Sequence, residues 1–141
     1  MNVASVMTTD IDCCTPESTC KEVAIKMKEL DVGVIPVCEN EKLVGIITDR
    51  DLVIKGLAND LSEESPVSKL ITDMVVKGTK DMSIEEAAKI MSHEQIRRLP
   101  IVENEKLVGM VSLGDLAVNN QSSEKAGEAL KDISVPSEPN K

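Results

Sequence analysis

The chain has 141 residues, a formal net charge of −9 and 41% hydrophobic residues, and it contains no Phe, Tyr or Trp. This length and apolar content suit one compact domain or two half-size units, and they exclude a disordered chain. The acidic balance and the lack of aromatic side chains argue against a nucleic-acid partner, because phosphate binding needs a surplus of Lys and Arg, and single strands stack on aromatic rings.

The N-terminal sequence lacks the basic and apolar regions of a signal peptide, and no apolar run approaches the length of a membrane span. We therefore expect a cytoplasmic protein that does not contact a membrane. Cys13, Cys14, Cys20 and Cys38 show no C-x-x-C spacing, and His93 is the single histidine. We expect no metal site and interpret the cysteines as reduced thiols in or near the core. A thiol redox sensor would require Cys13, Cys14 or Cys20 to be exposed with a lowered pKa.

An internal duplication organises the whole chain. The heptapeptide Glu-Asn-Glu-Lys-Leu-Val-Gly begins at Glu39 and again at Glu103, an offset of 64 positions. With the same offset and no gap, 10 of the 21 residues in 32–52 are identical to those in 96–116. Such a repeat indicates two copies of one supersecondary unit that need each other to bury a core.

The first copy opens with a short extended piece at residues 11–14. Thr19 and Glu22 then have the spacing of a capping box, which predicts the start of a helix. Three apolar residues of this helix share one face: Val23, Met27 and Leu30. Residues 33–38 and 43–47 are predicted strands of a hairpin around a polar Glu-Asn-Glu-Lys turn, and a second helix starts at Thr48.

The second copy follows a polar linker at residues 61–66 and repeats the same order. Its extended piece is expected at residues 74–76, and Ser83 with Glu86 forms the second capping box. The helix face consists of Ala87, Ile90 and Met91, and the hairpin strands are residues 98–102 and 107–111, followed by a helix from Ser112.

These elements predict an α+β fold of two tandem β-α-β-β-α repeats with pseudo-twofold symmetry and one shared core. We assign the repeats to residues 3–60 and 67–118. The polar segment 119–141 is expected to be a largely disordered tail, with a weak helix at 124–133. The packed copies would leave clefts between them, in which a ligand could touch both.

The candidate functional residues follow the second strand of each hairpin. Thr48-x-x-Asp51 and Ser112-x-x-Asp115 each place a hydroxyl and a carboxylate in the first turn of a helix. One interpretation is purely structural, because this spacing is close to a capping box. The other is that backbone N–H groups and the hydroxyl bind phosphate, while the carboxylate accepts from ribose hydroxyls. Together these two chemistries indicate a nucleotide.

The chain resembles a CBS-domain pair, or Bateman module, over about residues 3–118. The resemblance rests on the duplication, the element order, two copies of the Gly-h-h-[Thr/Ser]-x-x-Asp pattern (h, apolar) and the h-Pro-h strand. In such proteins the motif aspartate holds ribose hydroxyls, the Thr or Ser lies nearby, and backbone around the proline strand frames adenine. The resemblance assigns these roles to Asp51, Asp115, Thr48, Ser112, Val34, Ile35, Pro36, Arg98, Leu99 and Pro100.

The resemblance further implies that the segment before each copy completes the other copy's site, so that residues 8–11 would face Asp115 and residues 72–75 would face Asp51. The copies also differ in their charges. Arg50 stands beside Asp51 as a candidate phosphate partner, whereas Gly114 stands beside Asp115. Conversely, Arg97 and Arg98 precede the second proline, and we expect the two sites to differ in affinity.

The resemblance implies a regulatory module that catalyses nothing and binds AMP, ADP, ATP or another adenosyl compound between its repeats. It would signal in trans to an unidentified protein partner or through self-association. The expected homodimer would use apolar faces near Ala24, Met27, Leu30, Leu52 and Leu116. The alternative hypothesis is a ligand-free structural or protein-interaction module whose nucleotide sites are vestigial.

Overall fold

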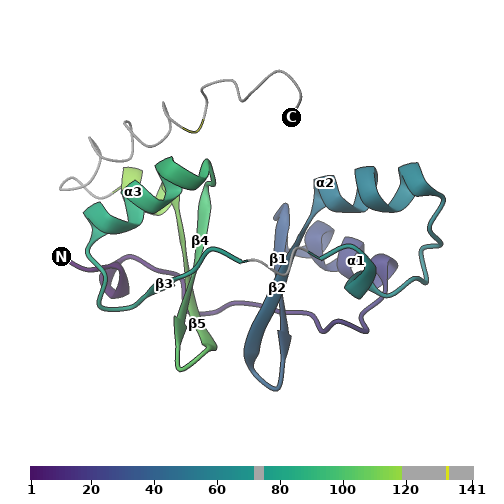
Figure 1. Cartoon of the computed structure of the whole chain (residues 1–141), viewed down its shortest axis with the longest axis horizontal. Helices are drawn as coiled ribbons and strands as arrows, with labels where there is room; N and C mark the ends of the chain where they lie inside the picture. Colours follow the sequence, from purple (N-terminus) through teal and green to yellow (C-terminus); the bar gives the residue numbers. More distant parts are fainter. Residues whose placement is uncertain (72–74, 119–132, 134–141) are drawn as a thin grey trace. The chain divides into compact units, whose positions relative to one another are not determined.

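The computed structural model describes residues 1–71, 75–118 and 133, and it has a mixed α+β fold (Figure 1). The chain divides into two compact units. Unit 1 comprises Met1–Ile11, Val76–Asn104 and Val108–Lys141, and unit 2 comprises Asp12–Val75 and Glu105–Leu107. The predicted disordered tail at 119–141, with its weak helix, lies outside the described residues apart from Ile133.

Unit 2 contains the helices and the hairpin of the first repeat. Its elements are α1 (Cys20–Leu30), β1 (Val34–Glu39), β2 (Lys42–Thr48), α2 (Asp49–Asp51), η2 (Leu52–Gly56), η3 (Leu57–Asn59) and η4 (Val67–Lys69). Strands β1 and β2 pair antiparallel, with a register shift between Val37 and Cys38.

Unit 1 contains the corresponding elements of the second repeat. They are η1 (Val3–Ser5), β3 (Gly78–Thr79), α3 (Ile84–Glu94), β4 (Arg98–Glu103), β5 (Lys106–Ser112) and α4 (Leu113–Ala117). The strands lie side by side in the order β5-β4-β3, and β3 pairs parallel with β4.

The two longer helices begin where the capping signals predict. The Thr19 hydroxyl accepts a hydrogen bond from the Glu22 backbone N–H at 3.1 Å, and the Ser83 hydroxyl accepts from the Glu86 N–H at 3.0 Å. Val23 and Met27 of α1 are buried, as are Ala87 and Met91 of α3. Leu30, the last residue of α1, is 45% exposed, whereas Val23 and Met27 of the same face are buried.

Each hairpin turns through two residues with positive φ. Asn40 and Glu41 have φ of 53° and 70°, and Asn104 and Glu105 have φ of 54° and 69°. A two-residue loop with both φ values positive is the type I′ turn, whose twist matches that of the paired strands. The repeated Asn-Glu therefore accounts for the tightness of both hairpins.

The first segment of each repeat packs into the core of the other repeat. Val3 is fully buried among the apolar residues of unit 1, and its N–H donates to the Met82 carbonyl at 2.9 Å. Val67, 64 positions later, is fully buried in unit 2, and its N–H donates to the Ser18 carbonyl at 2.8 Å. The buried residues form two clusters, so the expectation of one shared core is replaced by a reciprocal exchange of segments between two cores.

The extended piece of the second repeat lies later than predicted. Strand β3 is Gly78–Thr79 rather than residues 74–76, of which Met74 lies outside the described residues. A Cβ atom on Gly78 would stand 3.0 Å from the Met82 sulfur and 3.1 Å from a methyl of Leu99. The close approach of β3 to the core therefore selects glycine, and the apolar run before it was a misleading signal.

Candidate functional site

The hairpin register of unit 2 brings the proline strand and the Thr-x-x-Asp motif together. Val34 at the start of β1 pairs with Thr48 at the end of β2. The Asp49 backbone N–H then donates to the Gly33 carbonyl at 2.9 Å, which joins the helix start to the residue before β1. The predicted residues Val34, Thr48 and Asp51 are thus gathered at one end of the hairpin.

The motif aspartate of unit 2 closes a complete capping box. The Thr48 N–H donates to Asp51 Oδ2 at 2.9 Å, and the Asp51 N–H donates to the Thr48 hydroxyl at 3.0 Å. The other carboxylate oxygen, Oδ1, lies 3.3 Å from Lys55 Nζ, and the Asp51 side chain is only 15% exposed. The motif therefore forms a capping box, as the structural interpretation predicts. The Thr48 N–H bond and the Lys55 ion pair fix the orientation of the Asp51 carboxylate.

Unit 1 reproduces this arrangement. The Ser112 N–H donates to Asp115 Oδ2 at 2.8 Å, and the Asp115 N–H donates to the Ser112 hydroxyl at 3.0 Å. The Leu113 N–H donates to the Arg97 carbonyl at 2.8 Å, the counterpart of the bond between Asp49 and Gly33. Since the cap uses Oδ2, the second oxygen of Asp115 is left for another donor; no ion pair to it occurs among the described residues.

The predicted adenine frame divides into buried side chains and accessible backbone. Ile35 and Leu99 are 1% and 0% exposed, and both belong to the apolar cores. Pro36 and Pro100 are buried as well. The side chains of Ile35, Leu99 and the two prolines are therefore largely closed to a ligand, whereas Val34 is only partly buried.

The N-terminal segment lies beside the unit 1 motif (Figure 1). Thr8 and Met110 exchange two backbone hydrogen bonds of 2.9 Å, two residues before Ser112. Met7 occupies the space where a Cβ of Gly109 would lie, which explains the glycine that opens the motif. The sequence analysis did not identify the Met7–Gly109 contact. The motif glycine was the signal that could have indicated a close approach.

The charges at the two motifs differ. In unit 2 the Asp49 carboxylate lies against Gly33, at 3.1 Å from the position that a Cβ there would occupy. In unit 1 the corresponding residues are Leu113 and Arg97, and Arg97 and Arg98 are both exposed. Neither arginine forms an ion pair within the described part of the chain. Unit 1 therefore offers more positive charge to an anionic ligand.

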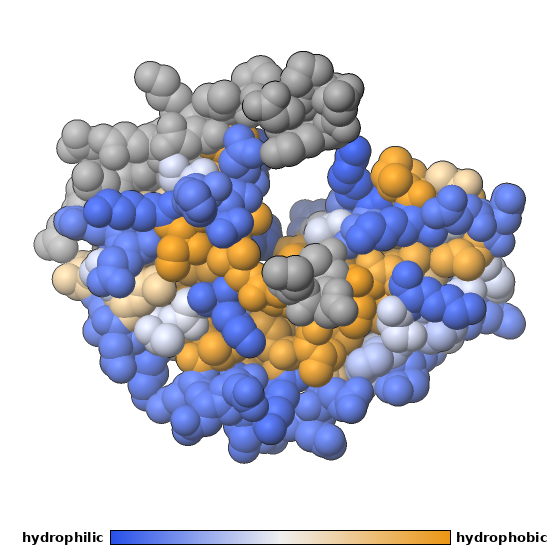
Figure 2. Space-filling view, in the orientation of Figure 1, coloured by the Kyte–Doolittle hydropathy of each residue, from blue (hydrophilic) through white to orange (hydrophobic). Residues whose placement is uncertain are grey.

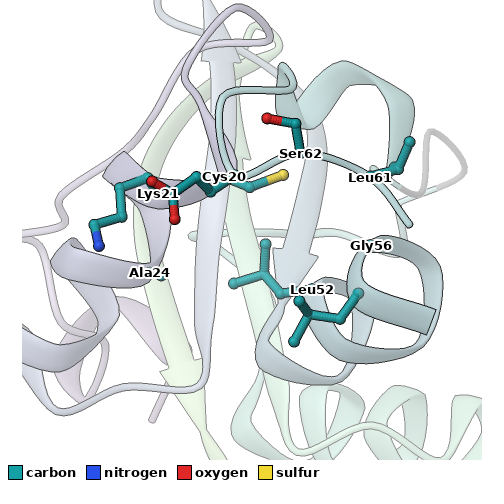
Figure 3. A pocket seen from close by; sticks show the side chains of 9 residues that line it. Cys20, Lys21, Ala24, Leu52, Gly56, Leu61 and Ser62 are labelled. Carbon is teal, nitrogen blue, oxygen red and sulfur yellow. The ribbon is translucent and has the colours of Figure 1, made fainter. Parts of the chain in front are cut away.

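One cavity of unit 2 lies away from the motif (Figure 3). It has a volume of about 200 Å³ and is lined by Cys20, Lys21, Ala24, Leu52, Gly56, Leu57, Leu61, Ser62 and Glu63. Drug-sized ligands usually occupy pockets of about 300 Å³ or more. Because it contains no motif residue and is small, this cavity is distinct from the candidate site.

Cys14 and Cys20, two of the three cysteines named for a redox sensor, do not have the lowered pKa that such a sensor requires. Burial raises the pKa of Cys14 to about 11, and it also raises the pKa of Cys20. Burial, and then a hydrogen bond to Cys13, raise the pKa of Cys38 to about 12. Within residues 1–71, 75–118 and 133, no group of three or more His, Cys, Asp and Glu residues could hold a metal ion. No helix among these residues is long and apolar enough to cross a bilayer.

The exchanged segments, the hairpins and the two capped motifs define a pair of CBS domains. The family model of the CBS domain matches residues 3–56 and 64–119, and the chain belongs to this family.

Relatives of known sequence and structure agree with this assignment. The CBS domain-containing protein YhcV of Bacillus subtilis is 45% identical over 133 residues, which cover 94% of this chain and 95% of YhcV. The crystal structure of Hypoxic Response Protein I, described with two coordinated zinc ions, has a TM-score of 0.77 at 32% identity and covers 83% of this chain and 97% of its own. The structure of CBSX2 in complex with AMP has a TM-score of 0.72 at 24% identity, covering 81% and 91% of the two chains, and shows likeness of fold.

Proposed function

We propose that this protein is a regulatory module that binds an adenine nucleotide or a related adenosyl compound at its capped Thr/Ser-x-x-Asp motifs. The observation that carries the proposal is the fixed carboxylate of each motif. A carboxylate has two oxygens and about four acceptor sites, so Asp115 can cap its helix through Oδ2 and accept from ribose hydroxyls through Oδ1. Capping and ligand binding are therefore compatible, and the cap orients the aspartate before the ligand arrives.

Charge supports unit 1 as the site for phosphorylated ligands. Arg97 and Arg98 are exposed beside the strand that pairs with the motif strand, and arginine binds phosphate in a bidentate manner. In unit 2 the Lys55 ammonium already pairs with Asp51, and the Asp49 carboxylate adds negative charge. We propose that AMP, ADP or ATP binds unit 1 more tightly. Unit 2, where the exposed Arg50 stands next to Asp51 and Asp49, would accept less charged adenosyl compounds.

The fold likeness to a CBS protein that binds AMP supports the class of ligand. The test is thermal unfolding of the full chain, followed by circular dichroism because there is no tryptophan. AMP, ADP, ATP and adenosine are added in turn. A ligand at 100 times its dissociation constant adds about 2.7 kcal/mol to the free energy of unfolding. We expect AMP to raise the midpoint, Asp115→Asn to reduce the rise, and the double variant Arg97→Gln/Arg98→Gln to reduce it for AMP but not for adenosine.

The ligand-free alternative keeps one specific observation in its favour. Both motifs form complete capping boxes, and this role alone would explain their hydroxyl and carboxylate residues. Under this alternative no adenine compound shifts the midpoint of unfolding, and the Asn variants alter stability only slightly.

We also propose that the module forms a homodimer and signals in trans. The surfaces named from the sequence need revision, because Met27 and Leu116 are 7% and 0% exposed and belong to the cores. The large exposed apolar side chains of unit 2 are Ile25, Leu30, Val53, Ile54 and Leu57. Figure 2 shows apolar surface over the helical segment that begins at α2 and continues through η2 and η3. Analytical ultracentrifugation of Leu57→Glu against the unsubstituted chain tests whether this surface mediates self-association.

A further inference from the structure

Two cysteines that are far apart in the sequence lie together in unit 2. The sulfur atoms of Cys13 and Cys38 are 3.5 Å apart, with Cys38 as the donor of an S–H hydrogen bond to Cys13. The backbone holds them there, because the Cys14 N–H donates to the Pro36 carbonyl at 3.0 Å and the Cys38 N–H donates to the Cys14 carbonyl at 2.8 Å. Both side chains are half-buried and neither is in a disulfide.

The repeat shows that the fold itself does not require this pair. Sixty-four positions later, Cys13 corresponds to Lys77 and Cys38 to Val102, and the second repeat folds in the same way. The β1–β2 register shift falls between Val37 and Cys38. Such irregularities bend a strand and redirect its side chains. The pair is thus a feature of the first repeat alone, placed by an irregular strand.

We propose that Cys13 and Cys38 form a reversible dithiol–disulfide pair that a low-molecular-weight disulfide oxidises. The Cys13 thiolate attacks one sulfur of the oxidant, so that a mixed disulfide forms on Cys13 and one thiolate leaves. The Cys38 thiolate then attacks the Cys13 sulfur, and the second thiolate leaves. The two cysteine thiols lose two electrons, the oxidant is reduced to two thiols, and the two cysteine protons pass to these leaving groups.

The surroundings decide the order of attack. Burial raises the pKa of Cys14 and of Cys38, so neither thiol begins the exchange readily. Cys13 is the acceptor of the Cys38 S–H bond, and its sulfur lies 3.5 Å from that of Cys38. Cys13 is therefore the attacking thiol. Cys38 resolves the mixed disulfide because it is already adjacent.

The disulfide would link the segment where the chain enters unit 2 covalently to β1. The chain enters unit 2 after Ile11. In the second repeat the corresponding segment pairs with β4 through the two residues of β3, whereas in the first repeat it pairs with β1 through a single bridge, Cys14 to Val37. Oxidation would add a covalent bond between this weakly paired segment and β1. The redox chemistry does not depend on nucleotide binding, so its test is independent of the test of the proposed function.

The experiment is oxidation of the full chain by glutathione disulfide, followed by intact-mass measurement and peptide mapping without reduction. We expect a product two hydrogen atoms lighter that links Cys13 to Cys38 and is reversed by dithiothreitol. Cys38→Ser should stop at one glutathione adduct on Cys13, while Cys20→Ser, the matched control, should still form the link. Wild-type protein that carries only glutathione adducts, or a disulfide joining other cysteines, would overturn the proposal even if the Ser variants fail to fold.

Discussion

Asp115 is expected to serve both as the N3 carboxylate of the α4 capping box and as a ligand acceptor, and the variant Asp115→Ala removes both roles. Without ligand, the variant loses the N–H···Oδ2 bond of 2.8 Å from Ser112. Loss of a cap costs about 1 kcal/mol, which corresponds to about 4 °C in the midpoint for a chain of this size.

With AMP the same variant loses more. A hydrogen bond to a charged group contributes about 1.5 kcal/mol, so the affinity should fall about tenfold. At an AMP concentration 100 times the wild-type dissociation constant, the ligand adds about 2.7 kcal/mol to wild-type stability but only about 1.4 kcal/mol to the variant. The variant therefore differs from wild type by about 1 kcal/mol without AMP and by roughly 2.3 kcal/mol with it.

Ser83→Ala is the matched control for this experiment. Ser83 is the N-cap of α3 in the same unit, and its hydroxyl accepts from the Glu86 N–H at 3.0 Å, so Ser83→Ala removes a capping hydrogen bond away from the candidate site. It should lose about 1 kcal/mol with or without AMP. Thermal unfolding by circular dichroism measures both variants. If AMP stabilises the wild-type protein but Asp115→Ala loses the same stability with and without AMP, the ribose role of Asp115 is refuted.

Three further predictions concern packing and protonation. Leu116→Ala should cost about 2–5 kcal/mol because Leu116 is fully buried, whereas Val118→Ala at an 84% exposed site should change stability by less than about 0.5 kcal/mol. Urea unfolding measures both variants, and equal effects would contradict the assigned core. Gly109→Ala should cost about 1–3 kcal/mol through its clash with Met7, and the double variant with Met7→Ala should recover part of it in the same assay. Burial raises the pKa of Cys14 to about 11 from 9.0, so its contribution is fully present below pH 9 and is lost as the pH rises toward 11. Cys14→Ala should therefore show a smaller fall in stability above pH 9 than wild type, and parallel pH profiles would count against this.

Local signals in the sequence were sufficient for the repeat, the helix starts and the hairpins. Thr19, Ser83, Thr48 and Ser112 all cap helices as their spacing predicts, because a cap depends on residues only three positions apart. The duplicated motif also led to the CBS family, which the family match confirms.

The tertiary structure alone decided which parts of the chain pack together. Val3 joins the core of the second repeat and Val67 joins the core of the first, although nothing local to either residue indicates its partner. The same holds for Cys13 and Cys38, whose contact depends on a parallel bridge between distant segments. Such pairings are long-range: the chain forms them only when buried surface repays the entropy of closing the loop.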